Sequence, residues 1–285
     1  MSLIPFSVAM SVYSKDNPLH LKEALISITD DQTVKPDEIV LVVDGPINNE
    51  LESVISFFDK KCNLKVIKLL CNKGLGNALR VASENCSHSL IARMDSDDIS
   101  LPYRFEQQIK MFIDNPNLDV LGGNISEFFD NKNNIVDYRN VPKTNIEIKK
   151  YLKKRCPFNH VSVMLKKEAL FKSGGYLDWH FNEDYYLWIR MFEAKCVFMN
   201  TGTVLVNVRA SKDQFKRRGG FNYFRSEYLL QKYMFKKRII HFPRFITNVI
   251  KRFLVQCLCT NSLRAFIYKS FARNKKEKNS NNIGY

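Results

Sequence analysis

The segment Asp95-Ser96-Asp97-Asp98 places three carboxylates within four positions. Such a group is electrostatically unfavourable unless a cation or a bound ligand compensates its charge. Oxygen ligands favour Mg2+ or Mn2+, and such an ion would bridge a diphosphate and neutralise the charge that grows on a leaving group. Helix capping is the alternative, since Asp98 or Ser100 could cap a helix beginning near Pro102. A cap uses only one side chain, so we predict a divalent-cation site at Asp95, Asp97 and Asp98.

Hydrophobic periodicity predicts the strands and helices that carry these acids. Short β-branched runs alternate with helical patterns, and this order predicts an α/β fold with a parallel sheet covered by helices. The predicted strands span residues 6–13, 38–43, 64–70 and 90–94, and the predicted helices span 19–29, 50–58 and 77–85. Further strands are expected at 118–122 and 161–165, and further helices at 146–154 and from residue 183 onward.

Ligands of such sheets bind beyond the carboxyl ends of the strands. Tyr13, Asp44 and Asp95 stand at the ends of three predicted strands, so polar groups converge on one rim. This rim is where we place the site. The segment Gly74-Leu75-Gly76 does not complete a dinucleotide-binding GxGxxG motif, because Leu79 stands where the third glycine belongs.

The chain has 285 residues and a net charge of +15, and that charge resides at its C-terminal end. Residues 210–285 hold 18 Lys and Arg against three acids, which accounts for all of the +15, whereas residues 1–209 hold 26 of each sign. Aromatic and aliphatic residues mix with Lys and Arg at helical spacing over residues 219–272, and Pro243 is expected to separate two helices there. We therefore divide the chain into a catalytic domain (1–220), a basic amphipathic helical extension (221–273) and a disordered tail (274–285).

Two kinds of partner suit this basic extension. Nucleic acid would pair its phosphates with the cations and its bases with the aromatic rings. An anionic membrane surface explains the pattern better, because helically spaced apolar residues beside Lys and Arg describe a helix that lies on lipid. We predict the membrane surface as the partner and no nucleic acid.

The cysteines and the N-terminus bear on location. Seven cysteines without pairing or metal-ligand spacing indicate reduced thiols. The N-terminus shows no secretory signal pattern, and the longest charge-free segment of the extension, residues 253–263, is shorter than the ~18 apolar residues of a spanning helix. We expect a cytoplasmic protein, peripheral at the inner face of the plasma membrane.

Five blocks occur in an order that resembles family 2 glycosyltransferases of the bacterial cell-surface polysaccharide type. The resemblance covers residues 5–220, and its blocks are Ser11-Val12-Tyr13, Val43-Asp44-Gly45, Asn72-Lys73-Gly74-Leu75-Gly76, Ala92-Arg93-Met94-Asp95-Ser96-Asp97-Asp98 and Glu183-Asp184. It implies the GT-A fold, with a mostly parallel central sheet flanked by helices. It also implies transfer with inversion from a nucleotide-sugar donor, expected to be a UDP-sugar, to a saccharide or lipid-linked oligosaccharide acceptor.

The resemblance also implies roles at the donor. Tyr13 and Asp44 would lie around the nucleobase, although Asp44-Gly45-Pro46 is equally a good turn sequence. Asp95 would contact the ribose or the water shell of the metal, Asp97 the metal, and Asp98 the metal or the donor sugar. Lys73, Gly74 and Arg93 belong to the same matching blocks and complete the predicted donor site.

Inversion requires a base opposite the departing diphosphate, and Asp184 is the candidate. It stands at the start of a helix whose apolar stripe would fix its position. A first-turn acid that only stabilises the helix dipole is the alternative from sequence alone, and the resemblance decides for catalysis. Glu183 and His160 are weaker candidates on the acceptor side.

The segment Gln214-Phe215-Lys216-Arg217-Arg218 could close over the diphosphate, because guanidinium groups bind phosphate oxygens in pairs. Processive members of the family carry Gln-x-x-Arg-Trp here, and this chain has Arg218 at the tryptophan position, which argues against polymerising activity. A nucleotidyltransferase on a related sheet is a further alternative. It would need a glycine-rich basic loop after the first strand, and residues 14–18 do not form one.

Overall fold

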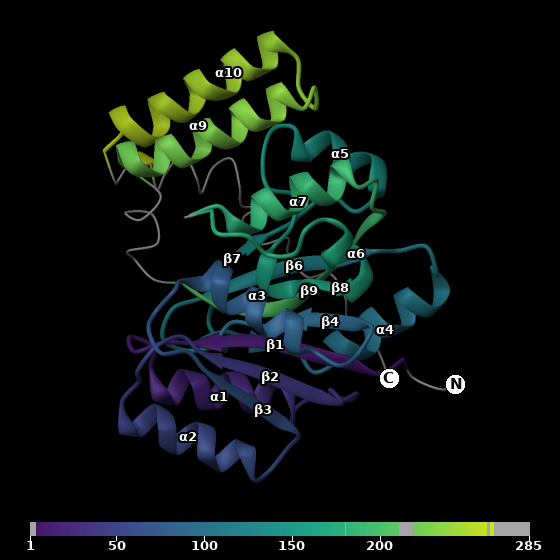
Figure 1. Cartoon of the computed structure of the whole chain (residues 1–285), viewed down its shortest axis with the longest axis vertical. Helices are drawn as coiled ribbons and strands as arrows, with labels where there is room; N and C mark the ends of the chain where they lie inside the picture. Colours follow the sequence, from purple (N-terminus) through teal and green to yellow (C-terminus); the bar gives the residue numbers. More distant parts are fainter. Residues whose placement is uncertain (1–3, 180, 211–218, 261–262, 265–285) are drawn as a thin grey trace.

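The computed structural model describes residues 4–179, 181–210, 219–260 and 263–264. The first half of the chain alternates strand and helix as predicted, with ends that differ by at most two residues (Figure 1). The elements are β1 (Phe6–Val12), α1 (Pro18–Ile28), β2 (Glu38–Val43), α2 (Asn49–Asp59), β3 (Leu64–Lys68), α3 (Leu75–Asn85) and β4 (Leu90–Arg93). These four strands are mutually parallel in the order β3-β2-β1-β4.

The remaining strands extend this sheet in mixed orientation. The elements are β5 (Ile99–Ser100), α4 (Arg104–Asp114), β6 (Val120–Phe128), β7 (Ile135–Arg139), α5 (Asn145–Leu152), β8 (Met164–Lys166), α6 (Lys167–Lys172), α7 (Glu183–Glu193) and β9 (Phe198–Arg209). The full order is β3-β2-β1-β4-β8-β6-β9-β5, with β7 beside β6. β8 is antiparallel to β4 and β6, whereas β9 is parallel to β6.

Two strand predictions need correction. The strand expected at 118–122 begins at Val120 and runs on through Gly122 and Gly123 to Phe128. These glycines are required by close packing, because a Cβ on Gly122 would lie 2.7 Å from the ring of Phe158. The strand expected at 161–165 starts only at Met164, since residues His160–Ser162 form a 3-10 turn.

Two hydrophobic cores cover the two faces of the sheet. Alternate residues of β1 face opposite cores, as strand geometry requires: Val8 and Met10 pack with the apolar sides of α1, α2 and α4, and Ala9 packs with α3. The second core also includes Trp188 of α7 and Leu230 of the C-terminal region. The rim formed by the carboxyl ends of β1, β2 and β4 is thereby held from both sides.

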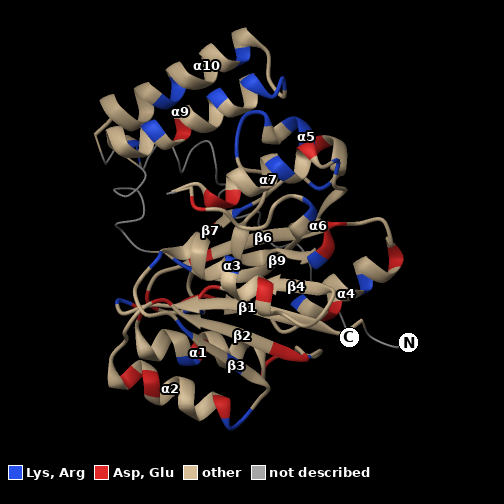
Figure 2. Cartoon of the chain, in the orientation of Figure 1, with Lys and Arg blue, Asp and Glu red and all other residues tan. Residues whose placement is uncertain are grey.

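The C-terminal region forms a helical hairpin, α9 (Phe221–Lys236) and α10 (Phe242–Phe253), and α10 continues as a short π-helix, Leu254–Leu258. Pro243 lies in the first turn of α10, so the predicted break between two helices is confirmed. The hairpin and α2 lie at opposite ends of the molecule (Figure 1), and Figure 2 shows Lys and Arg spread over the hairpin. Within the described residues, no helix is long and apolar enough to cross a membrane.

Candidate functional site

The acidic loop after β4 brings the three predicted ligands together. Asp95, Asp97 and Asp98 each offer a carboxylate oxygen, and these oxygens all lie within 4.8 Å of one another. Burial, followed by the charges of Asp97 and Asp95, raises the pKa of Asp98 well above its usual range. The side chain of Asp97 reaches solvent, yet the protein packed around it and the charges of Asp95 and Asp16 raise its pKa to about 6. Three oxygens that repel one another at this spacing fit a divalent cation.

Asp98 is held by the end of β9 and does not cap a helix. Its Oδ1 accepts a hydrogen bond of 2.8 Å from the backbone N–H of Arg209. The Arg209 side chain donates from Nε to the carbonyl of Asp97 at 3.1 Å and from Nη2 to Glu23 at 2.6 Å. Helix α4 has Tyr103 as its N-cap residue and no side-chain cap, so the capping interpretation of Asp98 and Ser100 is wrong.

Two buried arginines, Arg93 and Arg104, stabilise the acidic loop. Arg93 ends β4 and forms an ion pair with Asp95. Its predicted role at the donor stays a prediction. Arg104 donates from Nη2 to the carbonyl of Arg93 at 2.7 Å, and burial together with the charge of Arg93 lowers the pKa of Arg104 to about 9. The sequence analysis missed Arg104, since an arginine at the start of an amphipathic helix ordinarily faces solvent.

The end of β1 adds a fourth acid that the sequence analysis missed. Oδ2 of Asp16 accepts hydrogen bonds from the backbone N–H of Tyr13 at 3.1 Å and from the hydroxyl of Ser96 at 2.8 Å. Burial raises the pKa of Asp16, and the charge of Asp95 acts in the same direction. Asp16 thus joins the predicted donor-side residue Tyr13 to the acidic loop. Its place four residues after the end of β1 was the only feature of the sequence that could have indicated its role.

Asp44, at the end of β2, organises the loop before α3. Its Oδ1 accepts from the backbone N–H of Lys73 at 2.7 Å, and its Oδ2 accepts from that of Gly74 at 2.9 Å. Gly45 follows with φ +88°, and a Cβ there would lie 2.6 Å from the backbone nitrogen of Asn72. The structure therefore brings Asp44, Lys73 and Gly74 together. Asp44 stabilises the loop before α3 through these two bonds, in addition to standing in a turn sequence.

Glu183 and Asp184 form the first turn of α7 beside this rim. Oδ2 of Asp184 accepts from the thiol of Cys156 at 3.4 Å. Burial, then the charge of Asp184, raises the pKa of Glu183 to about 7, and Arg93 opposes this shift. A Cβ on Gly76 would lie 3.5 Å from Cβ of Glu183, so the start of α3 packs directly against the start of α7. The acid pair therefore lies within electrostatic range of the Arg93–Asp95 ion pair.

His160 lies against the rings of Tyr176 and Trp188, and its Nε2 is 2.9 Å from the Tyr176 hydroxyl. Burial and the charge of Arg93 lower its pKa well below the usual range, so the ring is neutral at pH 7. Its acceptor-side role stays a prediction. Arg217 and Arg218, the predicted phosphate clamp, lie outside the described residues.

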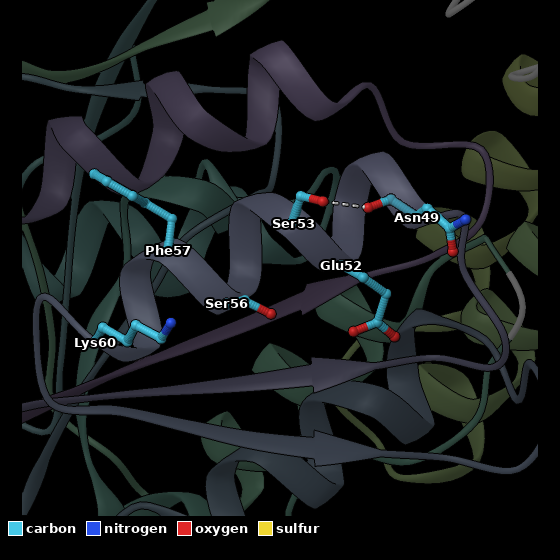
Figure 3. A pocket seen from close by; sticks show the side chains of 6 residues that line it. All are labelled: Asn49, Glu52, Ser53, Ser56, Phe57 and Lys60. Carbon is cyan, nitrogen blue, oxygen red and sulfur yellow. Dashed lines mark hydrogen bonds between the residues drawn. The ribbon is translucent and has the colours of Figure 1, made fainter.

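A shallow surface pocket occurs on the outer side of α2, lined by Asn49, Glu52, Ser53, Ser56, Phe57 and Lys60 (Figure 3). All six residues belong to one helix or its end, and Ser53 only donates to the backbone of Asn49. This pocket carries no convergent acids, so the candidate chemistry resides at the strand rim.

The sheet and its acidic loop define a GT-A fold. A crystal structure of S. aureus TarS 1-349 in complex with UDP-GlcNAc aligns with a TM-score of 0.66 at 16% identity, covering 88% of this chain and 73% of TarS. The mannosyltransferase PcManGT from Pyrobaculum calidifontis, in complex with GDP-Man and Mn2+, aligns with a TM-score of 0.60 at 14% identity, covering 95% and 78%. The predicted fold is confirmed.

The chain belongs to glycosyl transferase family 2, whose sequence pattern matches residues 7–175. It is 40% identical over 268 residues to an uncharacterised glycosyltransferase of Haemophilus influenzae, covering 94% of this chain and 99% of that one. It is equally similar to the UDP-Gal:alpha-D-GlcNAc-diphosphoundecaprenol beta-1,3-galactosyltransferase of Escherichia coli, covering 94% and 96%. The predicted enzyme class, a glycosyltransferase, is confirmed.

Proposed function

We propose that this glycosyltransferase moves a hexose, galactose first among candidates, from a UDP donor to a lipid-linked GlcNAc diphosphate, with inversion and with a divalent cation. The reaction would belong to cell-surface polysaccharide synthesis. The observation that carries the chemistry is the acidic loop, whose three carboxylates lie within 4.8 Å of one another at the end of β4. The substrates are inferred from 40% identity across nearly the whole length of the E. coli galactosyltransferase.

The residues at the carboxyl ends of β1, β2 and β4 would bind the donor. Asp95, Asp97 and Asp98 would hold Mn2+ or Mg2+, and the ion would supply Lewis-acid stabilisation of the departing diphosphate. Arg93 keeps Asp95 in place through their ion pair, and Asp16 aligns the strand end that carries Tyr13. Tyr13 is 38% exposed and would stack on the base. The Lys73–Gly74 loop, fixed by Asp44, would form a wall beside it.

Asp184 would act as the base that takes the proton from the acceptor hydroxyl as it attacks the anomeric carbon. Its Oδ1 accepts from the backbone N–H of Tyr185 at 2.7 Å and its Oδ2 accepts from Cys156, so the carboxylate is oriented by two donors. Each oxygen retains a further acceptor position for the incoming hydroxyl. Because α7 is anchored by the fully buried Trp188, the carboxylate is mounted on a rigid element.

The E. coli relative is a beta-1,3-galactosyltransferase. A β-linked product formed from an α-linked nucleotide donor requires inversion, which agrees with a single base in place of a protein nucleophile. An acceptor anchored in lipid would place the enzyme at the inner face of the membrane, with the basic C-terminal region as the natural contact.

The experiment is transfer from UDP-galactose to a synthetic GlcNAc diphosphate carrying a short prenyl chain, in the presence of MnCl2. Nuclear magnetic resonance of the product reports the configuration of the new linkage. A β linkage supports the proposal, and an α linkage contradicts inversion. The absence of transfer from every UDP-hexose tried, with transfer from another nucleotide sugar, would overturn the donor assignment.

A further inference from the structure

Helix α10 turns an apolar stripe outward. Phe242, Ile246, Ile250 and Phe253 are 58%, 37%, 51% and 40% exposed, and their spacing of four, four and three residues aligns them on one side of the helix. Leu254, which is 47% exposed, continues the row into the π-helical turn. We refer to these five side chains as the outer stripe. Contiguous exposed apolar surface of this kind marks a contact site.

The opposite side of α10 faces the protein, and it is held there by polar contacts and by the ring of Phe245, which stacks on Phe235. Nδ2 of Asn248 donates to Oε1 of Gln231 at 2.8 Å and to the carbonyl of Lys153 at 3.0 Å. Arg252 pairs with Glu227 at 2.5 Å and donates to the carbonyl of Lys154 at 2.9 Å. A helix on the surface of a water-soluble domain buries its apolar side and exposes its polar side. In α10 most of the apolar side chains lie on the exposed side instead, so the outer stripe is suited to an apolar medium.

The charge around the stripe selects the partner. Arg225, Lys232, Lys236, Arg238 and Lys251 are exposed on the hairpin. The only acid between residues 219 and 264 is Glu227, which is buried against Arg252. A second copy of the chain would bring the same excess of positive charge to the contact and be repelled. An anionic lipid surface is complementary in both its apolar and its charged layer.

We propose that the outer stripe of α10 enters the boundary layer of an anionic bilayer while the exposed lysines and arginines of the hairpin contact the lipid phosphates. The proposal deepens and rests on the proposed function, because a lipid-linked acceptor would be presented at this surface. The hairpin is joined to the candidate base: Nδ2 of Asn182, the residue before Glu183, donates to the hydroxyl of Ser226 in α9 at 3.0 Å. Docking of α10 thereby sets the position of Asp184 relative to the lipid.

Flotation of the full chain on vesicles tests the docking. The vesicles are phosphatidylcholine alone or a mixture with phosphatidylglycerol, and the variants are Ile246→Asp with Ile250→Asp, and Phe57→Asp. Phe57 is the matched control, because it is 56% exposed and lies on α2 at the far end of the molecule (Figure 1). Wild type and Phe57→Asp should float with the anionic vesicles, and the double variant should bind them at least tenfold more weakly. Equal flotation of the double variant would overturn the proposal.

Light scattering tests whether a second copy of the chain, and not lipid, covers the outer stripe. If wild type is a dimer in lipid-free buffer and the double variant is a monomer, the outer stripe binds a second copy of the chain. That result would overturn the lipid assignment. Equal molar masses of wild type and the double variant would support the lipid assignment.

Transfer assays keep this inference separate from the proposed function. With a detergent-dispersed short-chain acceptor, the double variant should match wild type, which also shows that it is folded. With the acceptor embedded in anionic vesicles, its rate should fall about tenfold while Phe57→Asp keeps the wild-type rate. Flotation without any transfer by wild type would contradict the proposed function alone, and transfer without flotation would contradict the docking alone.

Discussion

The backbone N–H of Arg209 donates a 2.8 Å hydrogen bond to Oδ1 of Asp98, which ties the last residue of β9 to the acidic loop after β4. The Arg209 guanidinium reinforces the tie by donating to the carbonyl of Asp97 and by lying over the ring of Phe128 at 4.7 Å. A loop of three carboxylates is thus held in shape by a strand that joins the sheet more than one hundred residues later.

Arg209→Ala should weaken Mn2+ binding. The substitution keeps the backbone bond to Asp98 but removes the contact with the Asp97 carbonyl, and groups that orient metal ligands contribute about 10- to 100-fold in affinity. Calorimetric titration of MnCl2 in the presence of UDP measures the effect. Glu23→Gln, which alters only the outer partner of Arg209, is the matched control and should lose less Mn2+ affinity. Wild-type affinity in Arg209→Ala would show that its side chain does not orient the acidic loop.

Asp184→Asn should lower kcat by about 10²- to 10⁴-fold, the usual contribution of a general base, and leave the KM for the donor nearly unchanged. Steady-state kinetics with a saturating acceptor give both values. Asp178→Asn removes an exposed carboxylate just before α7, and it should stay close to wild type. Cys156→Ser keeps a donor beside Asp184 and should stay active as well. Full activity in Asp184→Asn would exclude it as the base.

Glu183→Gln should change the pH dependence of stability. The pKa of Glu183 is raised from 4.5 to about 7, so the unfolded chain ionises first and the folded wild type loses stability as pH rises through this window. Relative to wild type, the variant should therefore gain up to about 3 kcal/mol in free energy of unfolding between pH 4.5 and 8. Urea denaturation across that range measures it. Glu168→Gln, an exposed first-turn acid of α6, is the control. A gain that does not vary with pH would contradict the burial of Glu183.

Gly45→Ala should destabilise the protein by about 1 to 3 kcal/mol, since it combines a left-handed backbone with a contact of 2.6 Å to the backbone of Asn72. Gly74 has a similar φ of +84° but open space around its Cβ position. Gly74→Ala should therefore cost less. Thermal unfolding of the two variants compares them, and equal losses would show that backbone strain alone accounts for the effect at Gly45.

Sequence patterns predicted the parallel half of the sheet because its strands are buried on both faces and read as continuous apolar runs, as in Glu38–Val43. They failed for β9, in which half-buried and exposed residues interrupt the buried ones over twelve positions. They stopped early in β6 because two glycines resemble a turn. In the site, motif spacing located the acidic loop, Asp44 and the Glu183–Asp184 pair.

Asp16, Arg104 and Arg209 could not be predicted in the same way. Each acts through a contact with a residue distant in sequence, such as the bond from Ser96 to Asp16 across 80 positions. The exposure of the outer stripe of α10 was hidden for a similar reason. Helical spacing shows that the apolar residues share one side, but only the packing against Gln231 and Glu227 shows which side faces the protein.

Acceptor-dependent release of UDP tests whether the acidic loop and Asp184 catalyse glycosyl transfer. UDP-galactose, MnCl2 and the short-chain GlcNAc diphosphate acceptor are incubated with wild type, Asp97→Asn and Asp184→Asn, and the released nucleotide products are separated by chromatography. We expect wild type to release UDP only when acceptor and metal are both present, and either variant to release it at least about 100-fold more slowly. Release of pyrophosphate would indicate a nucleotidyltransferase, and undiminished release of UDP by Asp97→Asn would contradict the assignment of the acidic loop to the metal.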